Sequence, residues 1–145
     1  MTKVYVSTVV NAPRAQVWQR VRDFNGLPAW HPGVADSRIE GDEPSDRPGC
    51  VRAFRFHSGN LVRERLLGLC DHTTSCRYTI VETALPVQNY IATLRLLPIT
   101  DGDRTFVEWS ADFDCPPDSQ ADVADRLGNA VFGRGLAGLR ASFES

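Results

Sequence analysis

The chain has 145 residues, of which 42% are hydrophobic and 23% charged, a composition typical of one globular domain and not of a disordered chain. Its formal net charge of −2 leaves no basic excess for binding nucleic acid or anionic lipid. Lys3 is the only lysine beside fifteen arginines and lies at an ordinarily mobile terminus, so Schiff-base chemistry is not expected.

The sequence also bears on where the protein resides. No apolar run approaches the length of a membrane span, and the first residues lack the apolar core and cleavage site of a signal peptide. There is no linker, repeat or low-complexity block. We therefore expect a cytoplasmic protein made of a single domain, residues 1–145.

The N-terminal part predicts a strand, a helix and a loop region. Apolar residues alternate over 4–10, which is typical of a strand. Pro13 suits the first turn of a following helix. The apolar stripe of that helix consists of Val17, Trp18 and Val21. Residues 24–33 contain two prolines and two glycines, so they allow only a short helical turn and loops.

Six further strand-like runs follow, separated by turn residues, and this succession predicts an antiparallel meander. The runs lie near 34–40, 50–57, 60–70, 76–83, 88–98 and 104–114. After Pro116 and Pro117, apolar residues recur at intervals of three and four from Val123 to Phe143, which predicts a long amphipathic helix.

The predicted C-terminal helix contains four glycines, although each interior glycine costs a helix roughly 1 kcal/mol relative to alanine. They are Gly128, Gly133, Gly135 and Gly138. Two interpretations are open: the glycines allow close packing against the helix, or they leave room beneath it.

Alternation along the strand around Glu64 predicts an inward carboxylate. Arg63 and Arg65 fall on one face, and Val62, Glu64 and Leu66 on the other. We expect the arginines to face solvent and Glu64 to point inward, with no basic residue on its own face. A buried carboxylate is costly unless it finds donors or a ligand. Glu64 is therefore a functional group, part of a structural network with tyrosines, or turned outward by a bulge.

The same period-two rule predicts an inner surface that is aromatic and aliphatic, with two phenols, Tyr78 and Tyr90. Such a surface is typical of a small-molecule pocket, but a closed core with its tyrosines hydrogen-bonded at the edge has the same pattern. The expected lining residues are Trp30, Phe54, Phe56, Leu66, Ile80, Leu94, Trp109, Phe113, Phe132 and Leu136.

Histidines and cysteines give weaker signals. His31 lies in an irregular loop near the expected cavity mouth, where it is either a proton-exchanging group or a surface histidine. The three histidines are dispersed and offer no clustered ligands for a metal hydrolase. No cofactor is expected. Cys70 and Cys76 flank a turn and are reduced thiols, a disulfide, or ligands of a metal together with His72.

Five motifs and the order of elements resemble a known family. The motifs are Asn11-Ala12-Pro13-x4-Trp18, Trp30-His31-Pro32-Gly33, Val62-Arg63-Glu64-Arg65-Leu66, Leu85-Pro86-Val87-x2-Tyr90 and Thr105-x3-Trp109. With the tail helix they cover nearly the whole chain and resemble the START-like (SRPBCC) superfamily, specifically its bacterial polyketide cyclase/dehydrase-like branch. The resemblance implies an α+β helix-grip fold: a seven-stranded curved antiparallel sheet around the long C-terminal helix, with two short helices after the first strand. It also implies an apolar ligand cavity between sheet and helix.

Two functions are consistent with these features. The favoured one is a binding module for a small apolar or aromatic molecule, polyketide- or lipid-like, oriented by Glu64 and the two tyrosines. The alternative is a cyclase/dehydratase in which Glu64 is the base, Tyr78 and Tyr90 stabilise the oxyanion, and His31 protonates the leaving hydroxyl. A small-molecule partner is expected in both cases. The sequence does not decide between a monomer and a homodimer.

Overall fold

The computed structural model describes residues 1–144; residue 145, the last of the predicted domain, lies outside the described residues. The chain begins with β1 (Thr2–Val10), helix α1 (Arg14–Val21) and a 3₁₀ turn, η1 (Leu27–Ala29). The next strands are β2 (Val34–Ile39), β3 (Val51–Phe56), β4 (Leu61–Cys70), β5 (Ser75–Glu82), β6 (Gln88–Ile99) and β7 (Arg104–Asp114), with a 3₁₀ turn, η2 (Glu40–Asp42), after β2. The predicted order of elements is confirmed, with strand ends shifted by one or two residues.

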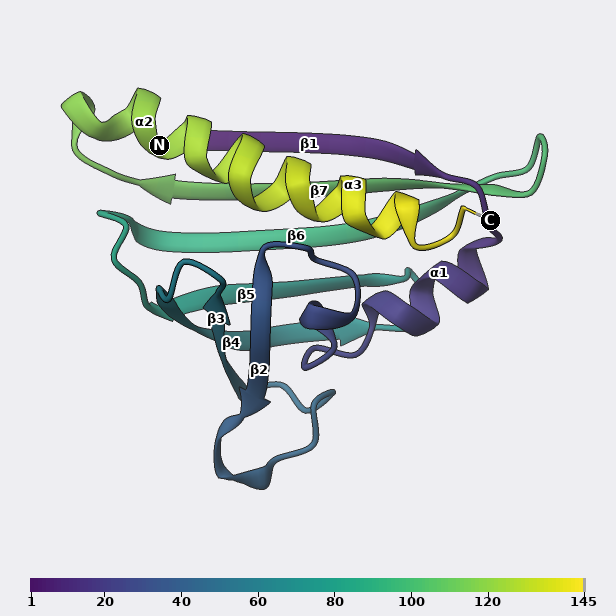
Figure 1. Ribbon diagram of the computed structural model, residues 1–145, viewed down its shortest axis with the longest axis horizontal. Helices are drawn as coiled ribbons and strands as arrows, with labels where there is room; N and C mark the ends of the chain where they lie inside the picture. Colours follow the sequence, from purple (N-terminus) through teal and green to yellow (C-terminus); the bar gives the residue numbers. More distant parts are fainter. Residues whose placement is uncertain (145) are drawn as a thin grey trace.

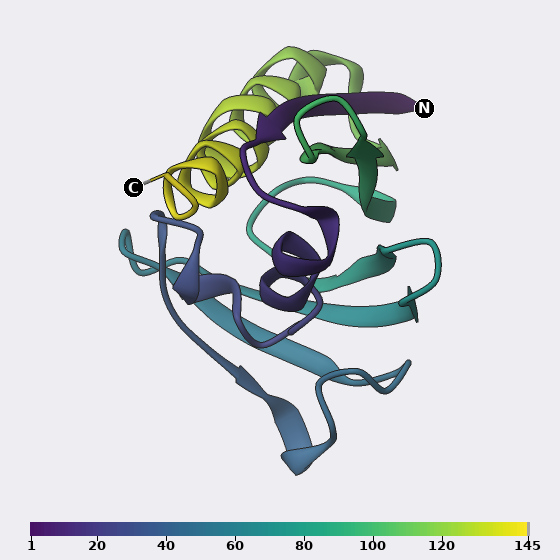
Figure 2. The same cartoon turned by 90° about the vertical axis from the view of Figure 1, so that its right-hand side faces the viewer.

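The seven strands form one antiparallel sheet in the order β1-β7-β6-β5-β4-β3-β2. Strands β2 to β7 pair with their neighbours in sequence, as a meander does, whereas β1 pairs with β7 at the opposite edge. The segment from α1 to η1 therefore carries the chain from one edge of the sheet to the other (Figure 1). Viewed from the side, the sheet curves, and α1 and the C-terminal helix both lie within the curve (Figure 2).

The C-terminal helix runs alongside β1 (Figure 1), and its Phe132 stacks on Trp109 of β7. It is built from η3 (Pro117–Ser119), α2 (Gln120–Asp125), a π-helical stretch η4 (Arg126–Gly133) and α3 (Arg134–Ala141). Its buried apolar side chains confirm the predicted stripe: Val123, Leu127, Phe132, Leu136 and Leu139. The π-helical stretch was not predicted, because period-four spacing of apolar residues does not distinguish it from an α-helix.

Burial along the strands follows the predicted alternation. In β4, Val62, Glu64 and Leu66 are buried, Arg63 is half-buried and Arg65 is exposed. In β7, every second residue from Thr105 to Phe113 is buried. The concave face of the sheet therefore carries the core, and the arginines of β4 lie on the other side.

The four cysteines are free thiols, which agrees with the first of the three interpretations. Cys70 pairs in register with Ser75, and Cys76 with Leu69, so the two thiols do not face each other across the turn. Within residues 1–144, no three His, Cys, Asp or Glu side chains gather as metal ligands would. None of the helices in this range is long and apolar enough to cross a membrane.

Candidate functional site

A small internal space lies between the sheet, the loop around η1 and the C-terminal helix. Its volume is about 10 Å³, which is room for one water molecule. The residues that line it are Leu27, His31, Val34, Arg52, Phe54, Phe56, Glu64, Tyr78, Trp109 and Val131. The structure thus brings together part of the predicted site: His31, Phe54, Phe56, Glu64, Tyr78 and Trp109.

The other predicted site residues belong to the core around this space and do not line it. They are Trp30, Leu66, Ile80, Tyr90, Leu94, Phe113, Phe132 and Leu136. Sequence reasoning missed four lining residues: Leu27, Val34, Arg52 and Val131. Leu27 comes from the loop region and Val131 from the helix, where alternation along strands gives no signal, and Val34 is the first residue of β2.

Glu64 and Arg52 form a buried ion pair at the floor of the space. They face each other across β4 and β3, and their exposed fractions are 5% and 6%. Arg52 donates from Nε and Nη2 to the same carboxylate oxygen, Oε1 of Glu64, at 2.9 and 2.7 Å. Its Nη1 donates to the backbone carbonyl of Phe24 at 3.0 Å. No residue within 1–144 donates a hydrogen bond to the other oxygen, Oε2 of Glu64.

The expectation that Glu64 has no basic residue on its face is therefore wrong. Alternation along β3 indicates a basic residue on that face: if Phe54 and Phe56 point inward, the residue two positions before Phe54 shares their face. That residue is Arg52, on the strand next to Glu64. A carboxylate that is buried needs a partner, and β3 supplies it.

Aromatic rings hold the guanidinium of Arg52 in place. Its Cζ lies 4.0 Å from the ring centroid of Phe24 and 4.9 Å from that of Tyr78, distances typical of cation–π contacts. Burial raises the pKa of Glu64, and the charge of Arg52 opposes that rise. Burial lowers the pKa of Arg52, but the Glu64 carboxylate outweighs it, so this pKa is raised. The pair is best described as two ions that compensate each other.

The two predicted phenols have different surroundings. Tyr78 lies at the space, where its hydroxyl oxygen accepts a hydrogen bond from Nε1 of Trp109 at 2.9 Å. Tyr90 stacks on Phe113 instead, with ring centroids 5.9 Å apart. Burial, reinforced by the charge of Glu64, raises the pKa of both tyrosines well above the usual range. Both are therefore neutral hydroxyl groups at physiological pH.

His31 is buried, with only 1% of its surface exposed, and both of its ring nitrogens bond to backbone. Nε2–H donates to the carbonyl of Val131 at 2.7 Å, while Nδ1 accepts from the N–H of Gly33 at 3.1 Å. This pair of partners assigns the neutral tautomer with its proton on Nε2. Burial lowers the pKa of His31, and the charges of Arg134 and Arg52 add to that effect. The interpretation of His31 as a surface histidine is wrong.

Two glycines of the C-terminal helix make the contact with the His31 loop possible. A Cβ atom at Gly135 would lie 2.6 Å from Cδ2 of His31, and one at Gly138 would lie 2.3 Å from the carbonyl oxygen of Trp30. Both distances are shorter than van der Waals contact. At these two positions, close packing is therefore the correct interpretation of the helix glycines.

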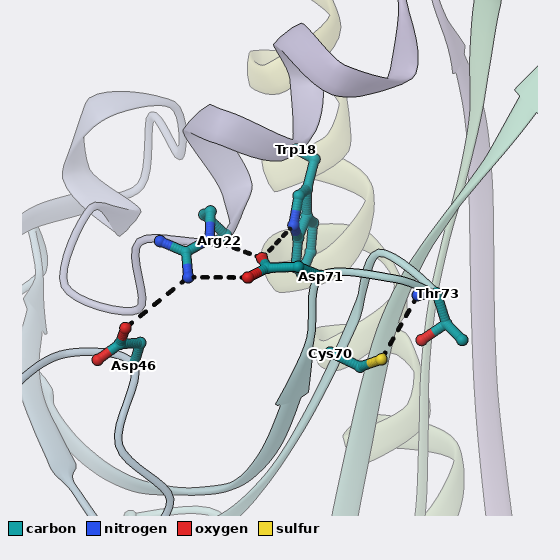
Figure 3. A network of polar contacts seen from close by, with 6 residues as sticks. All are labelled: Trp18, Arg22, Asp46, Cys70, Asp71 and Thr73. Carbon is teal, nitrogen blue, oxygen red and sulfur yellow. Dashed lines mark hydrogen bonds and ion pairs between the residues drawn. The ribbon is translucent and has the colours of Figure 1, made fainter.

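A second polar network lies outside this site, at the turn between β4 and β5 (Figure 3). Asp71 accepts hydrogen bonds from Nε1 of Trp18 and Nε of Arg22, both at 2.8 Å, and so ties α1 to the turn. Next to it, the sulfur of Cys70 accepts from the N–H of Thr73 at 3.5 Å. The network anchors α1 and shares no residue with the lining of the internal space.

The site thus combines aromatic walls with polar groups that are almost all engaged. Glu64 and His31, the groups expected to exchange protons, each have a partner in the folded protein. The exception is Oε2 of Glu64, an acceptor with no donor within residues 1–144. This arrangement can orient a polar group of a bound molecule more readily than it can move a proton.

Comparison with known proteins places this geometry in a family. No curated protein matches the chain. It is similar to the solved structure of the protein XoxI from Bacillus cereus, with 29% identity over 99% of this chain and 96% of that one, and a TM-score of 0.87. A protein from Thermobifida fusca has 32% identity over 99% of this chain and 93% of that one, with a TM-score of 0.88. These similarities confirm the predicted helix-grip fold. The sequence model of the family described as polyketide cyclase/dehydrase and lipid transport matches residues 1–144, and the chain belongs to that family.

Proposed function

We propose that the protein binds a small apolar or aromatic molecule between the sheet and the C-terminal helix, against the Glu64–Arg52 pair. The observation that carries this proposal is the buried carboxylate of Glu64: it lines a space walled by Phe54, Phe56 and Trp109, and its Oε2 accepts no hydrogen bond from residues 1–144. Mostly apolar walls with a few placed polar groups are typical of small-molecule sites. The family description, which includes lipid transport, supports the same class of ligand.

Binding requires the space to open, because a volume of about 10 Å³ holds no molecule larger than water. Phe56 at the end of β3 and Val131 in η4 are half-buried, whereas the other lining residues are buried. The way in therefore lies between these two side chains. Rotation of the Phe56 ring about its side-chain torsions opens the space without a change in the sheet.

Fluorescence titration with N-phenyl-1-naphthylamine, an uncharged probe, tests this proposal. We expect Phe56→Ala to bind the probe more tightly than the wild type, because the variant removes the ring from the mouth. Val131→Trp should weaken binding, because the larger side chain fills the same mouth. Val9→Trp, on the exposed side of β1, is the matched control and should leave binding unchanged.

Two results would overturn the proposal. One is the absence of probe binding to both the wild type and Phe56→Ala, with both proteins shown to be folded by circular dichroism. The other is equal binding by Val131→Trp and the Val9→Trp control, because the probe would then occupy another part of the molecule.

The alternative function, an acid–base cyclase/dehydratase, receives no specific support from the geometry. A general base must take a proton, and the charge of Arg52 opposes the protonation of Glu64. A general acid at the mouth must have a proton to give, but the proton of His31 already bonds to Val131. Ligand binding therefore remains the better-supported proposal.

A further inference from the structure

Resting on the proposed binding function, we infer that the internal site selects uncharged ligands that carry a hydroxyl group and discriminates against carboxylates of the same size. The hydroxyl donates its hydrogen bond to Oε2 of Glu64. The apolar part of the ligand lies against the rings of Phe54 and Trp109.

The guanidinium of Arg52 keeps two of its five N–H groups free of partners within residues 1–144, but the protein already engages most of it. Each of its three nitrogens already donates to a protein oxygen, two to Glu64 and one to the backbone of Phe24. The rings of Phe24 and Tyr78 lie over it. Its charge is also compensated, because Glu64 is the one acidic group among the lining residues. A ligand carboxylate placed here would be a second negative charge beside a single cation.

Among the residues that line the space, no other cation is able to receive a carboxylate; Arg134, whose charge acts on His31, is exposed and lies outside the lining. His31 is the only other basic side chain in the lining, and both of its ring nitrogens bond to backbone in the neutral tautomer. Taking a carboxylate out of water without a charge partner is strongly unfavourable. A fatty acid or an aromatic acid therefore loses more free energy on entering this site than its neutral counterpart does.

The unused atom of the pair is an acceptor, so the complementary ligand group is a donor. Both hydrogen bonds from Arg52 go to Oε1 of Glu64, and Oε2 receives none from residues 1–144. An O–H group bonded to a carboxylate forms a charge-assisted hydrogen bond, which is stronger than one between neutral groups. A methyl ether has no such proton, and its oxygen would face the negative oxygen of Glu64.

The ring of Tyr78 lies 4.9 Å from Cζ of Arg52, and its hydroxyl accepts from Nε1 of Trp109. This phenol therefore adds a neutral polar group to the wall and no charge. Amines would also offer donors to Glu64, but they would add a positive charge.

Isothermal titration calorimetry at pH 7 with four naphthalenes of similar size tests the inference. The probes are naphthalene, 1-methoxynaphthalene, 1-naphthol and 1-naphthoate. We expect the wild type to bind 1-naphthol about tenfold more tightly than 1-methoxynaphthalene, since one charge-assisted hydrogen bond separates them. We expect 1-naphthoate to bind most weakly of the four.

The variant Glu64→Gln tests whether the carboxylate charge sets the ligand preference. It removes the negative charge and leaves Arg52 uncompensated, so the preference should reverse and 1-naphthoate should bind more tightly than 1-naphthol. Glu82→Gln, an exposed carboxylate on β5, is the control and should keep the wild-type order. If Glu64→Gln does not fold, the order of the four probes on the wild type still decides the question.

The outcomes separate this inference from the function on which it rests. Equal affinities for 1-naphthol and 1-methoxynaphthalene, or tightest binding of 1-naphthoate, overturn the ligand class but leave the binding site standing. No binding of any of the four probes to the wild type overturns both.

Discussion

The two walls of the internal space each bury a titratable group, and they do so by opposite means. On the sheet wall, Glu64 and Arg52 remain charged because each compensates the other across β4 and β3. On the wall made by the loop and helix, His31 remains neutral because burial lowers its pKa, and its two nitrogens bond to backbone groups. The first wall depends on a partner charge, and the second on close packing. This difference predicts distinct responses to mutation and to pH.

The largest expected effect comes from breaking the ion pair on the sheet wall. Arg52→Met leaves Glu64 buried without a partner, and we expect a loss of about 3–5 kcal/mol in the free energy of unfolding. The double variant Arg52→Met/Glu64→Leu should lose less, because no unpaired charge remains. Urea denaturation measures both. A single variant as stable as the exposed control Arg65→Met would show that the pair does not stabilise the fold.

The next effect concerns the packing of the loop against the helix. Gly138→Ala would place its Cβ 2.3 Å from the backbone oxygen of Trp30, and we expect it to destabilise by about 1–3 kcal/mol. At Gly128, the added Cβ meets only a side-chain atom of Val4 at 3.6 Å. Gly128→Ala should therefore be neutral or stabilising by up to about 1 kcal/mol, because alanine favours the helix. Equal effects of the two substitutions in thermal denaturation would contradict the close contact.

The pH response should separate the two walls further. Burial lowers the pKa of His31 below its usual 6.5, so below that pH the unfolded chain binds a proton that the folded chain does not. Stability should therefore decrease as the pH falls below 6.5, by at most about 1.4 kcal/mol per pH unit. Arg134 on the helix and Arg52 on the sheet, the latter with its partner Glu64, are the charges that face His31.

His31→Gln isolates this contribution, because the amide keeps a donor for the carbonyl of Val131 without titrating. The difference between the wild-type and variant stabilities, measured by urea denaturation from pH 7.5 to 5, should shrink as the pH falls. A difference that stays constant over this range would contradict a neutral, buried His31. Glu64 does not obscure the comparison, because it is present in both proteins.

The smallest expected effect is a difference in reactivity between two thiols. Cys76 lies on the inner face of the sheet wall, where burial raises its pKa to about 11. Cys70 is exposed, and hydrogen bonds from Thr73 lower its pKa. Iodoacetamide at pH 8 should therefore alkylate Cys70 and leave Cys76 unmodified, as read by mass spectrometry of peptides. Rapid alkylation of Cys76 in the native protein would show that the sheet wall opens readily.

The sequence by itself determined the order of the elements and the inward direction of Glu64. Both follow from periodicity: alternation in the strands and spacings of three and four in the tail helix report which face is buried, wherever the element lies. The same rule, applied to β3 as it was to β4, would have placed Arg52 inward as well. The inward position of Arg52 is therefore encoded in the sequence.

Only the tertiary structure decided how closely the elements pack and which polar atoms remain free. Whether His31 is exposed or bonded to Val131 depends on a contact between residues 100 positions apart in the chain. The volume of about 10 Å³ also depends on how side chains from the sheet, loop and helix meet. Periodicity reports which face of an element is buried, but it carries no information about the distance to the element opposite.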